Sequence, residues 1–288
     1  MIQSLCPTSG PHPQEPSNMN STARTFMNPI FQRTAVAIAM AAACATASAQ
    51  LPQFTLDPSA AGLAGTSFTA DNVLISDYST VRFDGAGNFT DSGFLSVSAA
   101  QLGGTTFTPT GLNSTYGLYF AFNGSGTTSL GDPSKTNTTG NFSNLDFQLY
   151  GYNGTASFGF NGANDPTTTA PMDLLLASGS LVPGTGSVAT LVSGGKFVPT
   201  AAATLTFQTA AGSNGFFADP NPFYDLAFAA FTNTTSQVTP FVGGFRIEQG
   251  GGAFNFASTP PIPEPETYAL MLAGLAAVGF VARRRRTA

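Results

Sequence analysis

The sequence predicts an all-β fold between residues 50 and 259, an antiparallel β-sandwich of the jelly-roll kind. Apolar residues in this stretch alternate with polar ones in short runs, and turn clusters rich in Gly, Pro, Asn and Asp separate the runs. No part of the stretch repeats apolar residues with the 3.6-residue period of an amphipathic helix. Period-two alternation is typical of half-buried strands, and many short strands joined by such turns favour packed antiparallel sheets.

Each predicted strand places its apolar residues on one face, because side chains alternate between the two faces of a strand. The first clear run contains Leu95, Val97 and Ala99. The next extends from Tyr116 to Phe122 and ends at the turn signal Asn123-Gly124. The other predicted strands contain Leu145/Phe147/Leu149, residues 173–182, Leu205/Phe207 and Phe245/Ile247. The predicted turns include residues 84–88, 131–133 and 219–222.

Residues 27–49 have the three parts of a secretory signal peptide. Arg33 supplies the positive charge, and an apolar segment follows it. Ala47 and Ala49 are the small residues expected before a cleavage site at Gln50. The body that follows is therefore expected to be exported.

The first 26 residues are rich in Pro, Ser and Asn, a composition that does not belong ahead of a signal peptide. We expect residues 1–26 to be a disordered start-site extension. The true start is then expected at Met19 or Met27.

Residues 260–288 form a tail with three parts. Prolines keep the first part extended, because proline and the residue before it avoid helical conformations. Sixteen helical residues rise about 24 Å, short of the roughly 30 Å hydrocarbon core, so we expect a thin transmembrane anchor. The arginines resist translocation and hold the C-terminus in the cytoplasm. The three parts are the motif Pro263, Glu264 and Pro265, the apolar residues 267–282, and the cluster Arg283, Arg284, Arg285 and Arg286.

This order of motif, apolar segment and arginine cluster resembles the PEP-CTERM sorting signal of Gram-negative bacteria that make exopolysaccharide. The resemblance implies processing beside Glu264 by an exosortase-type membrane protease. It also implies an exported protein that is held transiently in the inner membrane and then reaches the cell surface or extracellular matrix. An ordinary tail anchor without processing is the alternative, but such an anchor does not need the Pro-Glu-Pro motif.

The body between the two processed ends contains no Cys, His or Trp. Disulfides, thiolate chemistry, His-ligated metals and Ser-His-Asp or Cys-His catalysis are therefore excluded there. Residues 50–262 carry four basic and twelve acidic residues, which gives a net charge of −8. Such a surface repels nucleic-acid phosphates, so nucleic acid is not an expected partner.

Carboxylates remain as candidates for chemistry, because two acids can hydrolyse a glycosidic bond without histidine. Glu248 is the single glutamate of the body, on a predicted solvent-facing position, and the aspartates mostly occupy turns. We therefore assign no catalytic residue and no cofactor. The best local Ca²⁺ candidate combines Asp84, Asn88 and Asp91. It lacks the Asp-x-Asp-x-Asp-Gly loop and closing Glu of an EF-hand, so a plain turn without metal is the preferred interpretation.

Most of the 26 phenylalanines lie at strand spacing and are expected in the core. Two aromatic pairs, Phe216-Phe217 and Phe223-Tyr224, lie beside turn residues instead. One interpretation is an exposed platform for a sugar ring. The preferred one is that these rings hold a loop against the core.

Five apolar motifs follow one another along the body, at residues 115–122, 174–179, 221–228, 238–245 and 250–256. Together with the tail they are similar to the flocculation-associated PEP-CTERM proteins of floc-forming bacteria. The resemblance implies a surface protein that helps hold cells within extracellular polysaccharide, and it brings no catalytic residues, so we expect a non-enzymatic role in flocculation or biofilm formation. A carbohydrate-binding module, a polysaccharide-acting hydrolase and an S-layer-like coat remain open as alternatives.

Overall fold

The computed structural model describes residues 51–129, 137–193 and 196–259. Strands make up 63% of the structure and helices 3%, so the predicted all-β fold is confirmed. The helices within these ranges are two single 3-10 turns, η1 (Ser59–Ala61) and η2 (Ala211–Ser213).

The start-site extension, the signal peptide and the sorting tail that the sequence predicts lie outside the described residues. Across the three described ranges, no helix is long and apolar enough to cross a membrane. The predicted anchor at residues 267–282 belongs to the part that is not described.

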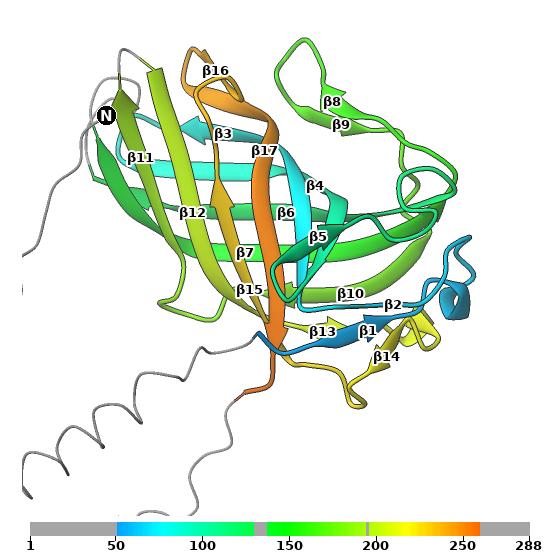
Figure 1. Cartoon of the computed structure of the whole chain (residues 1–288). Coiled ribbons are helices and arrows are strands. Elements are labelled where there is room, and N and C mark those ends of the chain that lie inside the picture. The colour runs from blue at the N-terminus through cyan, green and yellow to red at the C-terminus, as the bar shows by residue number, and fades with distance from the viewer. Residues whose placement is uncertain (1–50, 130–136, 194–195, 260–288) are drawn as a thin grey trace, which may run out of the picture. The chain divides into compact units, whose positions relative to one another are not determined.

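One antiparallel sheet closes on itself as an eight-stranded barrel (Figure 1). The ring is completed by β7 and β11, which pair from Thr138↔Thr190 to Gly140↔Val188. The sequence predicted two stacked sheets, and this β-sandwich prediction is corrected to a barrel. In order around the barrel the strands are β11 (Ser187–Ser193), β12 (Lys196–Thr206), β15 (Leu226–Thr232), β17 (Gly244–Ala257), β3 (Asn72–Phe83), β4 (Asn88–Leu102), β6 (Tyr116–Thr128) and β7 (Thr138–Asn153).

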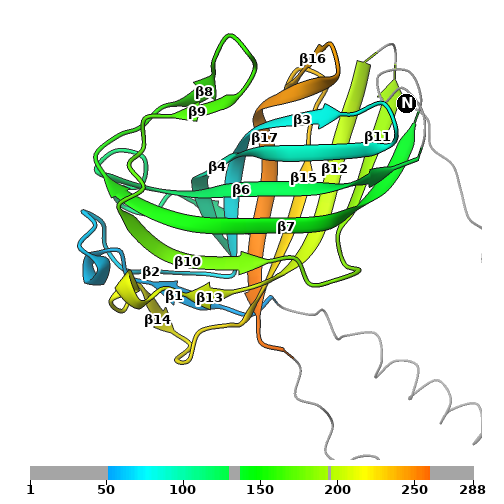
Figure 2. The same cartoon turned by 180° about the vertical axis from the view of Figure 1, so that it is seen from behind.

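The barrel has two walls whose strands cross at a steep angle (Figures 1 and 2). β11, β12, β15 and β17 form one wall, and β6, β7 and the neighbouring β10 (Leu174–Ser180) form the other. β3 and β4 bend and so connect the two walls, as strands do at the corners of orthogonally packed sheets. The predicted sandwich and the observed barrel therefore share two facing layers of inward side chains, and they differ in how the layers are joined.

The bend between the walls has a local cause in the sequence. A Cβ at Gly93 of β4 would overlap the Tyr78 carbonyl oxygen and would lie 2.7 Å from the Cβ of Ser79. β17 has an irregular register between Glu248 and Gly250, and the intervening Gln249 has a φ of 58°. Glycines and bulges of this kind let strands turn a barrel corner. We call this region the barrel corner.

The other strands extend or cover the barrel. β10 pairs with β7 and also with β13, and β5 and β16 pair with β4 and β17. A separate three-stranded sheet, β14-β1-β2, and the hairpin β8-β9 complete the described fold. The bounds of these strands are β1 (Phe54–Leu56), β2 (Phe68–Ala70), β5 (Thr105–Phe107), β8 (Phe158–Phe160), β9 (Pro166–Thr168), β13 (Gln208–Thr209), β14 (Phe217–Asp219) and β16 (Val238–Phe241).

Inward side chains of both walls form one apolar core. Phe120 of β6 stacks on Phe254 of β17 with their ring centroids 4.4 Å apart, which joins the walls through the middle of the barrel. The predicted inward face of the first half of β6 is confirmed, because all four of its residues are buried. They are Tyr116, Leu118, Phe120 and Phe122.

The predicted end of this strand at Asn123-Gly124 is wrong, since β6 continues to Thr128. A Cβ at Gly124 would lie 2.9 Å from Phe142 Cε1 and 3.0 Å from Leu145 Cδ1. Gly124 therefore gives the neighbouring side chains room to pack and does not form a turn.

Candidate functional site

The outer face of β6, β7, β10 and the following strands carries polar side chains at successive outward positions. Cross-strand pairing aligns Asn123 with Asp146 and Ser180, and Gln148 with Ser178. These residues border a shallow groove of about 390 Å³. We call it the outer polar groove, and we define it by Asn123, Asp146, Gln148, Ser178, Ser180, Thr206 and Gln208.

Hydrogen bonds hold several of these side chains in place. The Tyr150 hydroxyl donates to Gln148 Oε1 at 3.0 Å, and the Ser180 and Thr206 hydroxyls lie 3.3 Å apart. Gly179 lies between Ser178 and Ser180, and a Cβ there would overlap the Thr206 carbonyl oxygen and lie 2.6 Å from the ring of the buried Phe147, so this position has room only for glycine. The groove thus presents amide, hydroxyl and carboxylate groups, a surface suited to hydrogen bonding with polyhydroxylated ligands.

A second polar group lies inside the barrel. Asp77 and Ser79 occupy successive inward positions of β3, Asp91 faces inward from β4, and Asn233 directly follows β15. Asp77, Asp91 and Asn233 line a cavity of about 70 Å³ whose other walls are mostly Phe, Leu, Val and Ala side chains. We call these four residues the interior acidic cluster.

The two interior carboxyl groups are strongly perturbed. Burial raises the pKa of Asp77 from 3.8 to about 7. The nearby Ser79 side chain lowers the pKa of Asp77 by a smaller amount. The Oγ of Ser79 nevertheless has no hydrogen-bond partner of good geometry. Burial also raises the pKa of Asp91 well above its usual value, and the charge of Asp77 raises it further. Perturbed acids in a cavity are a recognised mark of a functional site.

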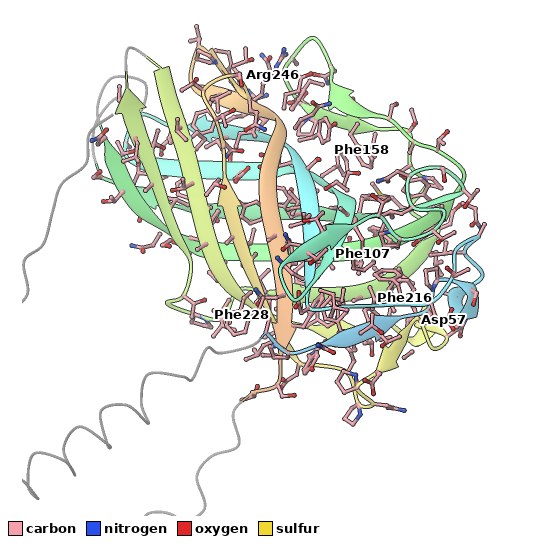
Figure 3. All side chains as sticks on the ribbon, viewed as in Figure 1. Asp57, Phe107, Phe158, Phe216, Phe228 and Arg246 are labelled. Carbon is pink, nitrogen blue, oxygen red and sulfur yellow. The ribbon has the colours of Figure 1, made fainter. Side chains whose placement is uncertain are left out.

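The arginines of the described body lie on the outside. Arg82 binds Asp165 at 2.8 Å and the Ala163 carbonyl oxygen at 2.9 Å. Arg246 donates to Asn164 Oδ1 at 3.2 Å and covers the ring of Phe160. Figure 3 shows Arg246 beside the β8-β9 hairpin. Both arginines therefore bind the hairpin to the barrel and do not pair with the interior acids.

The Ca²⁺ candidate of the sequence is divided between two places. Asp84 and Asn88 share an exposed turn, where Asp84 Oδ1 accepts from the backbone N–H groups of Ala86 at 2.7 Å and Asn88 at 3.0 Å. The hydrogen bond from the Asn88 side chain lowers the pKa of Asp84 most, and these two backbone bonds lower it further. Asp91 lines the interior cavity instead. Asn88 and Asp91 are three residues apart in β4. They therefore face opposite sides of the strand, because side chains alternate between its two faces.

The remaining predicted site residues are outside the described part of the chain. These are Ala47 and Ala49 of the signal peptide, Pro263, Glu264 and Pro265 of the motif, and Arg283, Arg284, Arg285 and Arg286. Within the described residues, no three His, Cys, Asp or Glu side chains gather in a metal-binding group.

The paired aromatic residues of the loops pack against the core, as the sequence favoured. Phe216 is fully buried, and Phe217, Phe223 and Tyr224 pack against the core in part. Figure 3 shows Phe216 among the elements near β1 and β14. An exposed sugar platform at these rings is therefore excluded. A separate aromatic cluster lies on the outer side of the barrel, where Phe158 of β8 covers Tyr119 and Phe94.

The acids Asp77 and Asp91 were missed as a pair. Each occupies an inward position in a run of alternating apolar and polar residues. A carboxylate at an inward position is the sequence signal that identifies such buried-face acids. The sequence interpretation placed the aspartates in turns, which holds for Asp84 and Asp165 but not for these two.

Fold and sites together define the body as an all-β barrel protein with a polar outer groove and two acids that line an interior cavity. Residues 261–286 match the PEP-CTERM protein-sorting motif. The chain therefore carries a PEP-CTERM sorting motif, which indicates an exported protein that is processed by exosortase, a membrane enzyme. We find no significant match among curated proteins or solved structures.

Proposed function

We propose that this barrel is displayed at the cell surface or in the extracellular matrix, where it contacts exopolysaccharide and supports flocculation or biofilm formation without catalysis. The observation that carries the proposal is the sorting motif at residues 261–286 on a barrel with a polar outer groove. Export by this route delivers the groove to the place where polysaccharide accumulates.

The chemistry of the outer polar groove supports a saccharide as the ligand. The groove contains three exposed side-chain amides, those of Asn123, Gln148 and Gln208. A side-chain amide can both donate and accept hydrogen bonds. A single neutral hydrogen bond contributes only about 0.5–1.5 kcal/mol net, so one groove binds weakly. Many copies on one cell strengthen attachment, because each later contact forms at high effective concentration.

The interior cavity offers less support for a polysaccharide hydrolase. Its volume of about 70 Å³ is far below the roughly 300–1,000 Å³ of pockets that enclose small molecules. Asp77 and Asp91 line this space and do not line the outer polar groove. A sugar ring bound in the groove would therefore not reach them.

Deletion of the gene tests the proposal in the cell. We expect the mutant to make normal amounts of polysaccharide but to disperse, and the full-length chain to restore flocs. A chain ending at residue 259 should not restore them if delivery by the tail is essential. Normal flocculation of the mutant would contradict the proposal, and depolymerisation of the native polysaccharide by the purified protein would favour the hydrolase.

A groove variant tests the contact surface. Combined Asn123→Ala, Gln148→Ala and Gln208→Ala substitutions should weaken retention on native polysaccharide by roughly tenfold or more, because several amide contacts are lost. The matched control combines Gln53→Ala, Thr110→Ala and Thr167→Ala, which are exposed residues outside the groove. Equal loss in both variants would show that binding does not depend on the groove.

A further inference from the structure

We infer that the interior acidic cluster is a binding site for a hard divalent cation of the Ca²⁺ type. The site is formed by oxygen atoms of Asp77, Ser79, Asp91 and Asn233. It differs from the turn at Asp84 and Asn88, and it goes beyond the proposed role in the matrix.

The barrel corner places these groups close to Asp77. Asn233 Oδ1 and the Cβ of Asp77 both face the bare backbone of Gly250, since a Cβ there would overlap the first and lie 3.1 Å from the second. Ser79 is the next inward residue along β3. Ser79 pairs with Gly93, and a Cβ at Gly93 would lie 2.7 Å from the Cβ of Ser79, so the missing side chain lets β3 and β4 approach closely between the positions of Asp77 and Asp91.

Asn233 provides an observation that is independent of the acids. It is 7% exposed, and its Nδ2 donates to the Pro199 carbonyl oxygen at 2.9 Å. That bond fixes the orientation of the amide, so Oδ1 is the atom left on the cavity side. Asn233 Oδ1 has no hydrogen-bond partner, and neither do Asp77 Oδ1, Asp91 Oδ1 and Ser79 Oγ. Buried polar atoms are usually satisfied, so unpartnered oxygens on three residues that line one cavity, with that of Ser79 next to Asp77 along β3, indicate a ligand.

Charge supports a cation in particular. The cavity-lining residues include two acids and no basic side chain. Buried charges in proteins are normally paired or coordinate a metal. Arg82 and Arg246 bind other groups on the outer side of the barrel. A divalent cation would balance the two carboxylates within the cavity.

The donor set selects among cations. Carboxylate, amide carbonyl and hydroxyl oxygens are the hard ligands of Ca²⁺, which takes six to eight of them. The cavity of about 70 Å³ has room for water molecules that complete the coordination, since one water needs roughly 10–15 Å³. With two carboxylates, we expect an affinity in the range of extracellular modules, with Kd of about 0.1–1 mM.

Calcium titration of the purified full-length protein tests the site. For the wild type in chelator-treated buffer at neutral pH, calorimetry should give one binding event per chain. Addition of 5 mM CaCl₂ should raise Tm by about 3–6 °C. Asp77→Asn should abolish both effects and should still fold, because the substitution keeps the shape of the side chain and removes a buried charge.

Asp173→Asn is the matched control, because Asp173 is exposed and its substitution changes the net charge equally. It should bind Ca²⁺ like the wild type. The inference is overturned if the wild type shows no heat and no Tm shift up to 10 mM CaCl₂. Equal binding by the wild type and Asp77→Asn would also overturn it, because the cation would then bind elsewhere.

Discussion

Asp77, like Asp91, has a carboxyl group whose surroundings strongly disfavour the charged form. It lies in a barrel interior built mainly from apolar side chains, and its exposed fraction is 4%. Its pKa of about 7 means that burial disfavours the carboxylate far more than the nearby polar groups favour it. Such a residue makes the stability of the barrel depend on pH.

The effect of Asp77→Asn on stability should change with pH when no cation is present. The native pKa of about 7 exceeds the ordinary value of 3.8, so the native state holds an extra proton between these values. The free energy of unfolding therefore falls as pH rises from about 4 to about 7 and stays lower above that range. We expect the variant to match the wild type at pH 4 and to gain on the order of 2–4 kcal/mol at pH 8.

Urea unfolding in the presence of a chelator, followed by circular dichroism at both pH values, measures this difference. Asp173→Asn serves again as the control and should change little at either pH. Parallel pH profiles for the wild type and Asp77→Asn would show that Asp77 is not the group responsible.

Among the strands, the bends of β3 and β4 decide the shape of the barrel. Gly93 of β4 lies against the backbone of β3 so closely that a methyl group would overlap it. Gly159 in β8 is also a strand glycine, but no heavy atom lies within 4 Å of the position its Cβ would take. Gly93 is therefore needed for the packing of β3 against β4, whereas Gly159 is not needed for packing.

Gly93→Ala should destabilise the protein by at least about 2 kcal/mol, because either β3 or β4 must move to make room. Gly159→Ala should be neutral or stabilise slightly, since it reduces the freedom of the unfolded chain without a clash. Thermal unfolding of both variants gives the comparison. A smaller loss for Gly93→Ala than for Gly159→Ala would mean that the corner is not held by this close approach.

For the whole molecule, the described barrel and the sorting motif occupy separate parts of the chain. The barrel is described as far as residue 259, and the matched motif begins at residue 261. Thr259 donates to both carboxylate oxygens of Asp225, at 2.6 and 2.7 Å, so the last described residue is attached to the loop before β15. Removal of the tail beyond this point would leave the described hydrogen bonds of the barrel intact.

Processing should therefore occur beside Pro263, Glu264 and Pro265 and leave a mature protein that ends before Thr267. Intact-mass measurement of the protein recovered from the matrix should show loss of the C-terminal arginines. Glu264→Ala should retain the unprocessed chain in the membrane, whereas Asp173→Asn should be processed normally. A matrix-derived species that still contains Arg283 to Arg286 would contradict the prediction.

Local patterns were enough to predict the all-β class, the inward face of β6 and the sorting tail. Alternation decides which side of a strand is apolar, and the tail is a continuous motif, so neither depends on distant parts of the chain. The outer polar groove was only partly visible, because alternation shows that Gln148 faces outward but not that Ser178 and Gln208 lie beside it.

Closure of the barrel and assembly of the interior acidic cluster were decided by tertiary structure alone. Pairing of β7 with β11 depends on segments far apart in the chain, and a sandwich would satisfy the same alternation. Asp77, Asp91 and Asn233 meet because Gly93 and Gly250 bring their strands together at the barrel corner. A sequence pattern specifies the face of each residue, whereas its neighbours across the barrel follow from strand register and bending.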